Sequence, residues 1–336
     1  MSTSGKSVKE VLQAFIENLD LVIDQLRKGE STRADTGDFQ VDKYWTHLGA
    51  VVKAVSHECT KLCITFSTPP LPAPEECSGL VSGLERATLA LVSAFYSLPT
   101  SQGLTLWKSS VDAVCDIIEG VQELVRRIAQ AETAGSTDQL QSTGKVWESC
   151  NGIKDIPKDN KAAVIAVVTG ASNLVKDALE ELEAAVENEG RLDDLDLGDD
   201  DSDDLEEETW SEADKRTIAP CIGLVKAVKA CLKKTSVAVR SNGECVTVAQ
   251  ITELDKLADV MRLTSPAVDD FVSGLYAPLD LEMAKDNARK LADIVLELLE
   301  LSKTSHVTFD EDVQWITFLK NAVQHNLEKI QNPVNS

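Results

Sequence analysis

Apolar residues recur every three or four positions along most of the chain, which has 336 residues. Near the N-terminus, Val8, Leu12, Phe15 and Leu19 share one side of a helix, and Gly29 follows as a helix-ending residue. The same spacing predicts further long helices over residues 39–66, 74–98, 103–131, 158–187, 211–239, 245–263, 266–304 and 309–331. Stretches of strict apolar–polar alternation are too short to form strands, so the pattern predicts an all-α fold.

Turn signals separate the predicted helices. The proline-rich run 69–74 ends the second helix, because proline lacks the backbone N–H and clashes with the preceding turn. Residues 135–144 are polar and predict a loop, which a short helical piece over 145–150 follows. Pro278 predicts a kink or a break in the last helix but one.

Acidic residues concentrate in one short stretch. The chain has a net charge of −23, and residues 191–212 hold 12 Asp/Glu against one Lys/Arg, about half of that excess. Like charges at this density resist compaction and leave few apolar residues to bury. The sequence therefore predicts two antiparallel helical bundles, a five-helix bundle over 1–189 and a second helical bundle over 209–336, joined by an acidic disordered linker over 190–208.

The charge and the cysteines restrict the partners and the compartment. No region is basic enough to neutralise a row of phosphates, so direct nucleic-acid binding is not expected. No stretch approaches the roughly 20 apolar residues that span a bilayer, and the N-terminus lacks an apolar signal core, so no membrane association is expected. A cytosolic or nuclear compartment with reduced thiols follows, in which the eight cysteines are small buried apolar side chains.

Residues that support catalysis are not arranged in a known motif. The sequence contains no glycine-rich phosphate loop, zinc-peptidase motif or nucleophile elbow, so the protein is not expected to be an enzyme and no catalytic or cofactor site is predicted. One cluster has metal-ligand potential: His57, Cys59 and Cys63, whose thiols lie one helical turn apart. Both thiols fall on the predicted core stripe, so burial is the preferred interpretation and no metal site is predicted.

Three hydroxyl side chains near the acidic stretch are candidate phosphorylation sites. Ser202 is flanked by acidic residues, and Thr209 and Ser211 have an acidic residue three positions later, as acid-directed kinases prefer. Ser211 has an alternative role: with Trp210 before it and Asp214 three residues on, it fits the N-cap of the following helix. A phosphate there would add charge at a helix N-terminus.

The segments 158–187 and 211–239, with the acidic stretch between them, can be described as helix–loop–helix. A DNA-binding version of that motif needs a basic helical extension. Residues 154–161, which precede the first helix, mix charges of both signs and contain Pro157. The segment is therefore not expected to hold DNA, and its two helices are expected to lie in separate bundles.

Several blocks of the sequence stand out when taken together. They are residues 156–163 (IPKDNKAA), 174–178 (LVKDA), 210–214 (WSEAD), the Pro-Cys and Lys-rich run over 220–234, and shorter matches at 66–72, 265–270 and 302–308. Each block is non-catalytic, but their joint order is specific and extends over about residues 40–330. In this order the blocks resemble the cyclin-D-interacting protein family.

The resemblance implies two helical bundles of the talin and vinculin-like kind and a negative regulator of cell-cycle progression. It implies binding of D-type cyclin, reduced phosphorylation of the retinoblastoma protein by the cyclin-dependent kinase, and dampened transcription by the factors that the retinoblastoma protein restrains. It also implies a location in cytoplasm and nucleus, with helix–loop–helix transcription factors and signalling adaptors as further partners. The family's leucine-zipper description does not fit, because Ala284 and Ser305 flank the heptad pair Leu291 and Leu298.

A second class of function is a talin/vinculin-like adaptor of the cytoskeleton or of signalling complexes, which only fold-level analogy supports. The sequence does not show which exposed residues contact a partner in either case. A bundle helix buries one face, and periodicity does not distinguish among the residues of the other.

Overall fold

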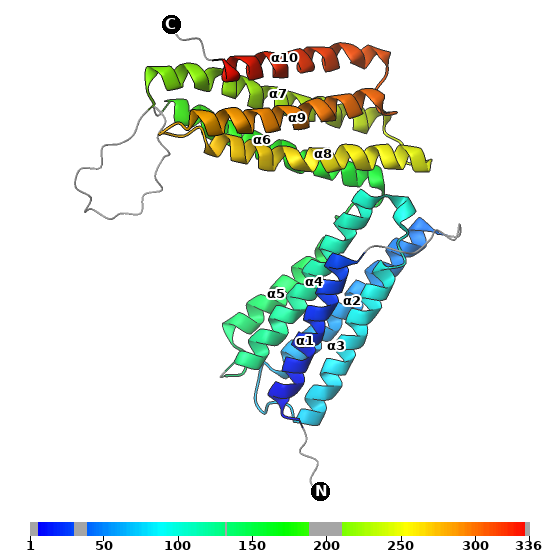
Figure 1. Cartoon of the computed structure of the whole chain (residues 1–336). Helices are drawn as coiled ribbons and strands as arrows, with labels where there is room; N and C mark the ends of the chain where they lie inside the picture. Colours follow the sequence, from blue (N-terminus) through cyan, green and yellow to red (C-terminus); the bar gives the residue numbers. More distant parts are fainter. Residues whose placement is uncertain (1–5, 30–38, 132, 188–209, 333–336) are drawn as a thin grey trace, which may run out of the picture. The chain divides into compact units, whose positions relative to one another are not determined.

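The structure is a computed structural model that describes residues 6–29, 39–131, 133–187 and 210–332. These residues form ten α-helices, two short 3-10 helices and no strand, so the prediction of an all-α fold is confirmed. The chain divides into two compact units, Met1–Asp159 and Asn160–Ser336 (Figure 1).

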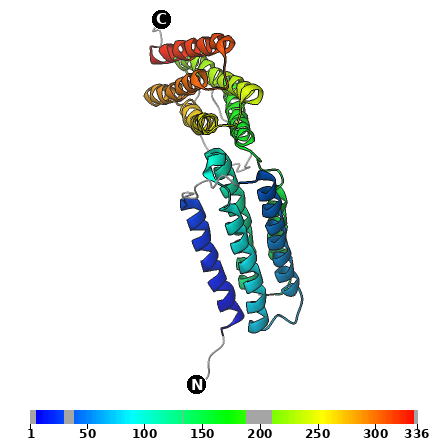
Figure 2. The same cartoon turned by 90° about the vertical axis from the view of Figure 1, so that its right-hand side faces the viewer.

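The first unit is a closed ring of five helices, each in contact with the next. The ring order is α1 (Val8–Lys28), α3 (Pro74–Phe95), α2 (Val41–Thr65), α5 (Thr137–Gly152) and α4 (Leu104–Gln130), with the 3-10 helix η1 (Thr100–Gln102) before α4. The helices run along one another in both views (Figure 2). Each helix turns one apolar stripe inward, and fully buried examples, one from each helix, are Leu12, Leu62, Leu84, Ile118 and Val146.

The second unit is also a closed ring of five helices. Its order is α6 (Asn160–Glu187), α8 (Val248–Ser273), α9 (Leu281–Thr304), α10 (Val313–Gln331) and α7 (Glu212–Asn242), with the 3-10 helix η2 (Asp310–Asp312) before α10. The shared core contains Val168, Val228, Met261, Val295 and Val323, one from each helix. Both units therefore have the same architecture, in which five amphipathic helices surround one apolar core.

The boundary between the units differs from the predicted one. The sequence predicts a five-helix bundle over 1–189 with 158–187 as its fifth helix, but this helix is α6, which packs against α7 and α8 in the second unit. The fifth helix of the first unit is α5 instead. Apolar periodicity shows which face of a helix is buried but not which helices cover that face, so it does not assign α6 to a bundle.

The predicted acidic linker over 190–208 lies outside the described residues. The helices on either side of it, α6 and α7, contact each other, with Glu183 paired to Lys226 at 2.7 Å and Arg240 donating to the Thr169 hydroxyl at 3.2 Å. The acidic stretch therefore joins two helices of one bundle. The expectation that the two helices of the helix–loop–helix description lie in separate bundles is wrong.

α5 begins at Thr137, inside the stretch 135–144 that the sequence predicts as a loop. Its buried side chains include polar ones whose hydrogen bonds are made within the protein: Gln139 Nε2 donates to the Cys63 carbonyl at 2.9 Å, and Thr143 Oγ1 donates to the Gln139 carbonyl at 2.8 Å. Because a buried stripe of polar residues has no apolar periodicity, the start of this helix was not predicted.

α8 runs through Pro266, where the sequence predicts a helix boundary, and the break comes at Pro278, as predicted. Proline inside a helix costs about 3 kcal/mol. Beyond it, Val268, Phe271 and Val272 are buried, and burial of each such side chain contributes about 1.5–3 kcal/mol. Burial therefore outweighs the cost of the proline and the helix continues.

α6 is the one helix in the described part of the chain whose length and composition are compatible with crossing a membrane. It has 28 residues and a mean hydropathy of 1.4 over its most apolar window, although no membrane-spanning stretch is expected from the sequence. Its apolar residues Val164, Val168, Val175 and Leu182 are buried in the core of the second unit. Packing against α7 and α8 accounts for the apolar composition of this helix.

Trp210 fastens the start of α7 to the connection between α8 and α9. Its side chain is only 4% exposed, and its Nε1 donates a hydrogen bond to the Leu275 carbonyl at 2.8 Å. Leu275 is itself fully buried. A buried carbonyl that loses its donor carries a desolvation cost, so this bond stabilises the second unit.

We predict that Trp210→Phe lowers the free energy of unfolding by about 1–3 kcal/mol, because it removes the N–H that pairs with the Leu275 carbonyl and fills less of the buried space than the indole. Urea denaturation followed by circular dichroism measures the change. Trp147→Phe is the matched control: the Trp147 indole donates to Thr60 Oγ1 at 3.0 Å but is 45% exposed, so water replaces the bond. Equal losses in the two variants would contradict the role assigned to Trp210.

Glu253 of α8 holds the loop between α9 and η2. Its carboxylate accepts hydrogen bonds from the His306 backbone N–H at 2.9 Å and from the His306 ring Nδ1 at 2.7 Å, while ring Nε2 accepts the Glu244 backbone N–H at 3.1 Å. Burial opposes ionisation of Glu253, but the hydrogen bonds from His306 and the nearby Lys256 outweigh it, so the pKa of Glu253 lies below its ordinary value.

A carboxyl group with a lowered pKa stabilises the fold above its ordinary pKa, and this stabilisation is lost as the pH falls through the lowered value. Glu253→Gln is therefore expected to be less stable than the parent chain at neutral pH, with a difference that shrinks below about pH 4. Thermal unfolding across this pH range checks it. Glu282→Gln is the control, since Glu282 is exposed and pairs with Lys285 on its own helix. A Glu253→Gln difference that stays constant with pH would refute the assignment.

Candidate partner-binding surface

The candidate metal ligands do not come together. Cys59 and Cys63 are buried in the core, whereas His57 is exposed on another side of the same helix. Burial raises the pKa of Cys59 far above its usual range, and the neighbouring Cys150 adds to the effect. Within the described ranges, no group of three His, Cys, Asp or Glu side chains is placed to hold a metal ion. Both thiols are core residues of the first unit.

The eight cysteines are all described, and none forms a disulfide. Seven are buried and Cys245 is partly buried, which confirms the predicted burial for seven. Burial raises the pKa of Cys115 and Cys150 to about 11, and that of Cys221 and Cys231 to about 12. Because the thiolate is the reactive form, burial keeps these thiols protonated, and they pack as apolar groups.

Of the three candidate phosphorylation sites, Ser202 and Thr209 lie outside the described residues. Ser211 is the N-cap of α7: its Oγ accepts the Asp214 backbone N–H at 3.2 Å, and Asp214 Oδ2 accepts the Ser211 backbone N–H at 2.8 Å. The predicted capping role is confirmed. A phosphate on this exposed hydroxyl would meet the positive end of a helix and also the negative charge of Asp214.

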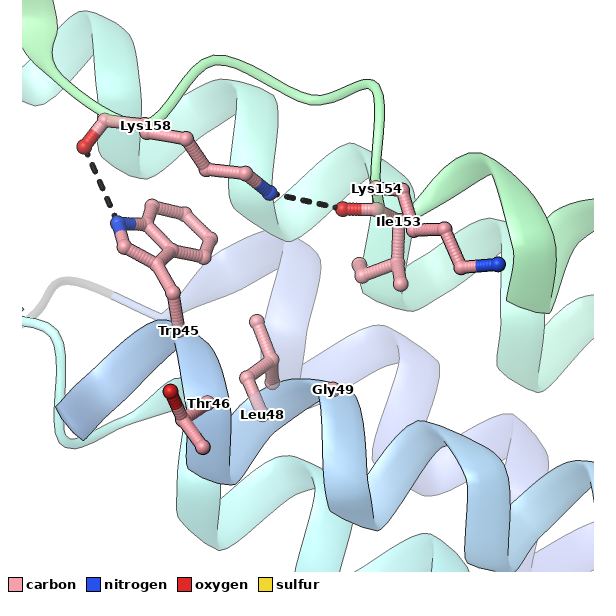
Figure 3. A pocket seen from close by; sticks show the side chains of 7 residues that line it. All are labelled: Trp45, Thr46, Leu48, Gly49, Ile153, Lys154 and Lys158. Atoms are coloured by element: carbon pink, nitrogen blue, oxygen red, sulfur yellow. Dashed lines mark hydrogen bonds between the residues drawn. The ribbon is translucent and has the colours of Figure 1, made fainter. Parts of the chain in front are cut away.

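A hollow of about 330 Å³ lies between α2 and the segment that follows α5 (Figure 3). Trp45 Nε1 donates to the Lys158 carbonyl at 3.1 Å, and Lys158 Nζ donates to the Ile153 carbonyl at 3.0 Å while lying 4.4 Å from the centre of the Trp45 ring. Burial lowers the pKa of Lys158, and Asp155 opposes the shift. The lining contains no Asp, Glu, His, Ser or Cys, and the amine of Lys158 is already held by the Ile153 carbonyl and the Trp45 ring. The contacts fasten the end of the first unit to α2.

Exposed apolar side chains gather where α2 meets α5. Ile64 is 65% exposed, Leu140 57% and Trp147 45%. Leu140 and Trp147 are seven residues apart and lie on one line of α5, the Trp147 indole reaches Thr60 of α2, and Ile64 lies one turn from Thr60 on the same side. We call Thr60, Ile64, Leu140, Gly144 and Trp147 the α2–α5 seam.

Polar contacts beneath it hold the α2–α5 seam in place. Gln139 Nε2 donates to the Cys63 carbonyl at 2.9 Å, and the Gly135 N–H donates to the Phe66 carbonyl at 3.2 Å. A Cβ added at Gly144 would meet nothing within 4 Å, so the surface is open there. Neighbouring exposed apolar side chains on a rigid support are typical of protein–protein contact sites.

Sequence reasoning did not find this surface. Leu140 lies in the stretch that reads as a loop, and Ile64 falls among the apolar residues of α2 without a feature that separates it from core positions. The one available signal is the seven-residue spacing of Leu140 and Trp147, which becomes visible only after α5 is known to be a helix.

Two family models match adjacent parts of the chain. Residues 47–188 match the model described as "Grap2 and cyclin-D-interacting, N-terminal", and residues 193–300 match the model described as "Grap2 and cyclin-D-interacting, C-terminal". The chain belongs to the Grap2 and cyclin-D-interacting family. The N-terminal model includes α6 and ends at residue 188, and the C-terminal model begins at residue 193. The two models therefore divide at the start of the acidic stretch and not at the structural boundary after Asp159.

Curated relatives extend the match over nearly the whole chain. Cyclin-D1-binding protein 1 homolog of Xenopus laevis is 40% identical over 327 residues, covering 96% of this chain and 98% of the relative. The Danio rerio protein of the same name is 41% identical, with 93% and 92% covered. Cyclin-D1-binding protein 1 of Homo sapiens is 35% identical, with 97% and 94% covered. The family resemblance seen in separate blocks of sequence is thus confirmed along the chain.

The burial of the cysteines predicts how many thiols react in the native chain. We expect one thiol per native chain, Cys245, to react with a disulfide reagent within minutes, and all eight to react after unfolding in urea. Cys245→Ser is expected to remove the rapid reaction and leave the folded state unchanged by circular dichroism. Two or more rapidly reacting thiols in the native chain would show that the core is not closed around the other seven.

Proposed function

We propose that this protein is a non-catalytic regulator that binds D-type cyclin and restrains cell-cycle progression. The observation that carries the proposal is the kinship with proteins named Cyclin-D1-binding protein 1 over almost the full length of both chains. Bound to D-type cyclin, the protein would lower phosphorylation of the retinoblastoma protein by the cyclin-dependent kinase. The retinoblastoma protein would then keep its target transcription factors inactive.

The α2–α5 seam is the surface that we assign to the cyclin. Interfaces draw most of their binding energy from a few large side chains in a water-excluding patch, with tryptophan prominent among them. Ile64, Leu140 and Trp147 supply such a patch, and the Trp147 indole already has its hydrogen-bond partner in Thr60. Closing a cyclin surface over them would bury apolar area without leaving a donor unpaired.

Further features of the proposal concern place and partners. The protein acts in both cytoplasm and nucleus, where its reduced cysteines are stable. Helix–loop–helix transcription factors and signalling adaptors are further partners, reached by surface contacts of the folded bundles. α6 and α7 pack within one unit, so the helix–loop–helix segment meets such factors as part of a bundle and not as a free dimerisation arm.

We predict that Ile64→Ser combined with Leu140→Ser weakens D-type cyclin binding at least about tenfold, because each substitution removes apolar area from the seam. A pull-down and a titration with purified D-type cyclin measure the affinity, and a retinoblastoma phosphorylation assay measures the consequence. The double variant should lose inhibition in proportion to its loss of binding.

The matched control is Leu174→Ser combined with Phe318→Ser, which removes two similarly exposed apolar side chains from the second unit. Binding unchanged by the seam variant, or reduced equally by the control, would disprove the assignment of the surface. No binding of the parent chain at micromolar cyclin would disprove the function itself. Deleting residues 191–208 in the parent chain separates direct use of the acidic stretch from a connecting role.

A further inference from the structure

The outer face of α7 is basic in an acidic protein. Between residues 215 and 242 the chain has seven Lys/Arg and no Asp/Glu, whereas the whole chain has a net charge of −23. Lys226, Lys233 and Arg240 are exposed and follow one another at seven-residue steps, so they lie in one line along the helix. With their basic neighbours they form what we call the α7 basic stripe: Lys226, Lys229, Lys233, Lys234 and Arg240.

The bundle neutralises little of this charge. Lys226 pairs with Glu183 of α6 at 2.7 Å, and Arg240 donates to the Thr169 hydroxyl at 3.2 Å. The other three lysines of the stripe make no ion pair with any residue that the structure describes. An exposed lysine without an ion pair is solvated by water, so leaving it unpaired has little effect on the stability of the fold. Its ammonium group therefore remains available to a carboxylate of another protein.

An apolar side chain lies inside the stripe. Val237 is 53% exposed and falls between Lys233 and Arg240 on the same line. From Lys226 to Arg240 the stripe is about 21 Å long, since a helix rises about 1.5 Å per residue. Over these four turns of α7, the stripe offers cations and one apolar side chain. An amphipathic helix presents its contact residues at three- and four-residue steps, so its face can pair with this arrangement.

The stripe acts as a surface of a folded helix and not as an extended basic peptide. Within the run 229–234, Cys231 and Leu232 are fully buried in the core of the second unit. Reading this run as an extended chain would require α7 to leave the ring and expose that core. A partner that recognises the folded face needs no such opening.

We propose that the α7 basic stripe docks an acidic amphipathic helix of a partner protein, with carboxylates on the lysines and an apolar side chain against Val237. Charge complementarity carries the assignment, since carboxylates spaced along a helix face match cations spaced along α7. Nucleic acid is the other polyanion that a basic stripe attracts. The negative field of the whole protein opposes a long phosphate backbone more than a short acidic helix.

The test uses the full chain and a fluorescein-labelled peptide of about 20 residues, long enough to hold a helix, with Glu at three- and four-residue spacing and Leu and Ala between. Fluorescence anisotropy measures its affinity. We expect binding at low ionic strength that weakens several-fold when salt is raised to about 0.2 M. Lys233→Glu combined with Lys234→Glu is expected to weaken it at least about tenfold.

The control variant is Lys290→Glu combined with Lys303→Glu, which changes the net charge equally at exposed lysines of α9. Compared at about 0.1 M salt, where screening limits charge interactions to about 10 Å, it should leave the affinity within about twofold of the parent chain. Unfolding curves of both variants confirm that each is folded. D-type cyclin is absent from this test, so its outcome is separate from that of the proposed function.

Three results would overturn the proposal. One is equal weakening by the two double variants, which would show that only net charge matters. Another is tighter binding of a single-stranded oligonucleotide of equal charge than of the peptide. The last is peptide binding only after residues 191–208 are deleted, which would show that the acidic stretch of the chain itself occupies the stripe.

Discussion

Closure of five apolar stripes around one centre holds each unit together. Each helix in such a ring lies between two others, and removing any helix exposes the stripes of both to water. α5, with 16 residues, closes the first unit between α2 and α4, and α10 closes the second between α9 and α7. Closure buries the inward faces, so in the closed form a partner contacts the outward faces.

Most of the fold follows from periodicity, and its failures have definite causes. The helices beginning at Val8 and Pro74 were predictable within a few residues, because apolar side chains mark their inner faces. Most of α5 could not be predicted, because its buried positions include the polar residues Gln139 and Thr143. α8 continues through Pro266 because burial of the residues beyond the proline stabilises the helix. The assignment of α6 to the first bundle was wrong for another reason: the apolar stripe of a helix does not specify which helices pack against it.

The candidate surfaces were harder to predict than the fold. Burial of Cys59 and Cys63 and capping by Ser211 followed from local pattern, because each depends on neighbours in the sequence. The α2–α5 seam depends on two helices distant in the chain, so Ile64 could not be connected to Trp147 before the ring order was known. The sequence shows that residues 215–242 of α7 contain no acidic residue. Only the structure shows which lysines of α7 have no ion pair with any described residue and so form a basic surface.

The place of α6 decides how this chain can be divided. The acidic stretch has the composition of a domain linker, but in the sequence it connects α6 and α7, two helices of one ring. A fragment ending at residue 189 carries α6 without α7 and α8, with Val164, Val168 and Val175 exposed, and is prone to self-association. A cut after Asp159 leaves two fragments with intact rings. A chain nicked within the acidic stretch would remain one particle, because α6 and α7 hold its halves together without a covalent link.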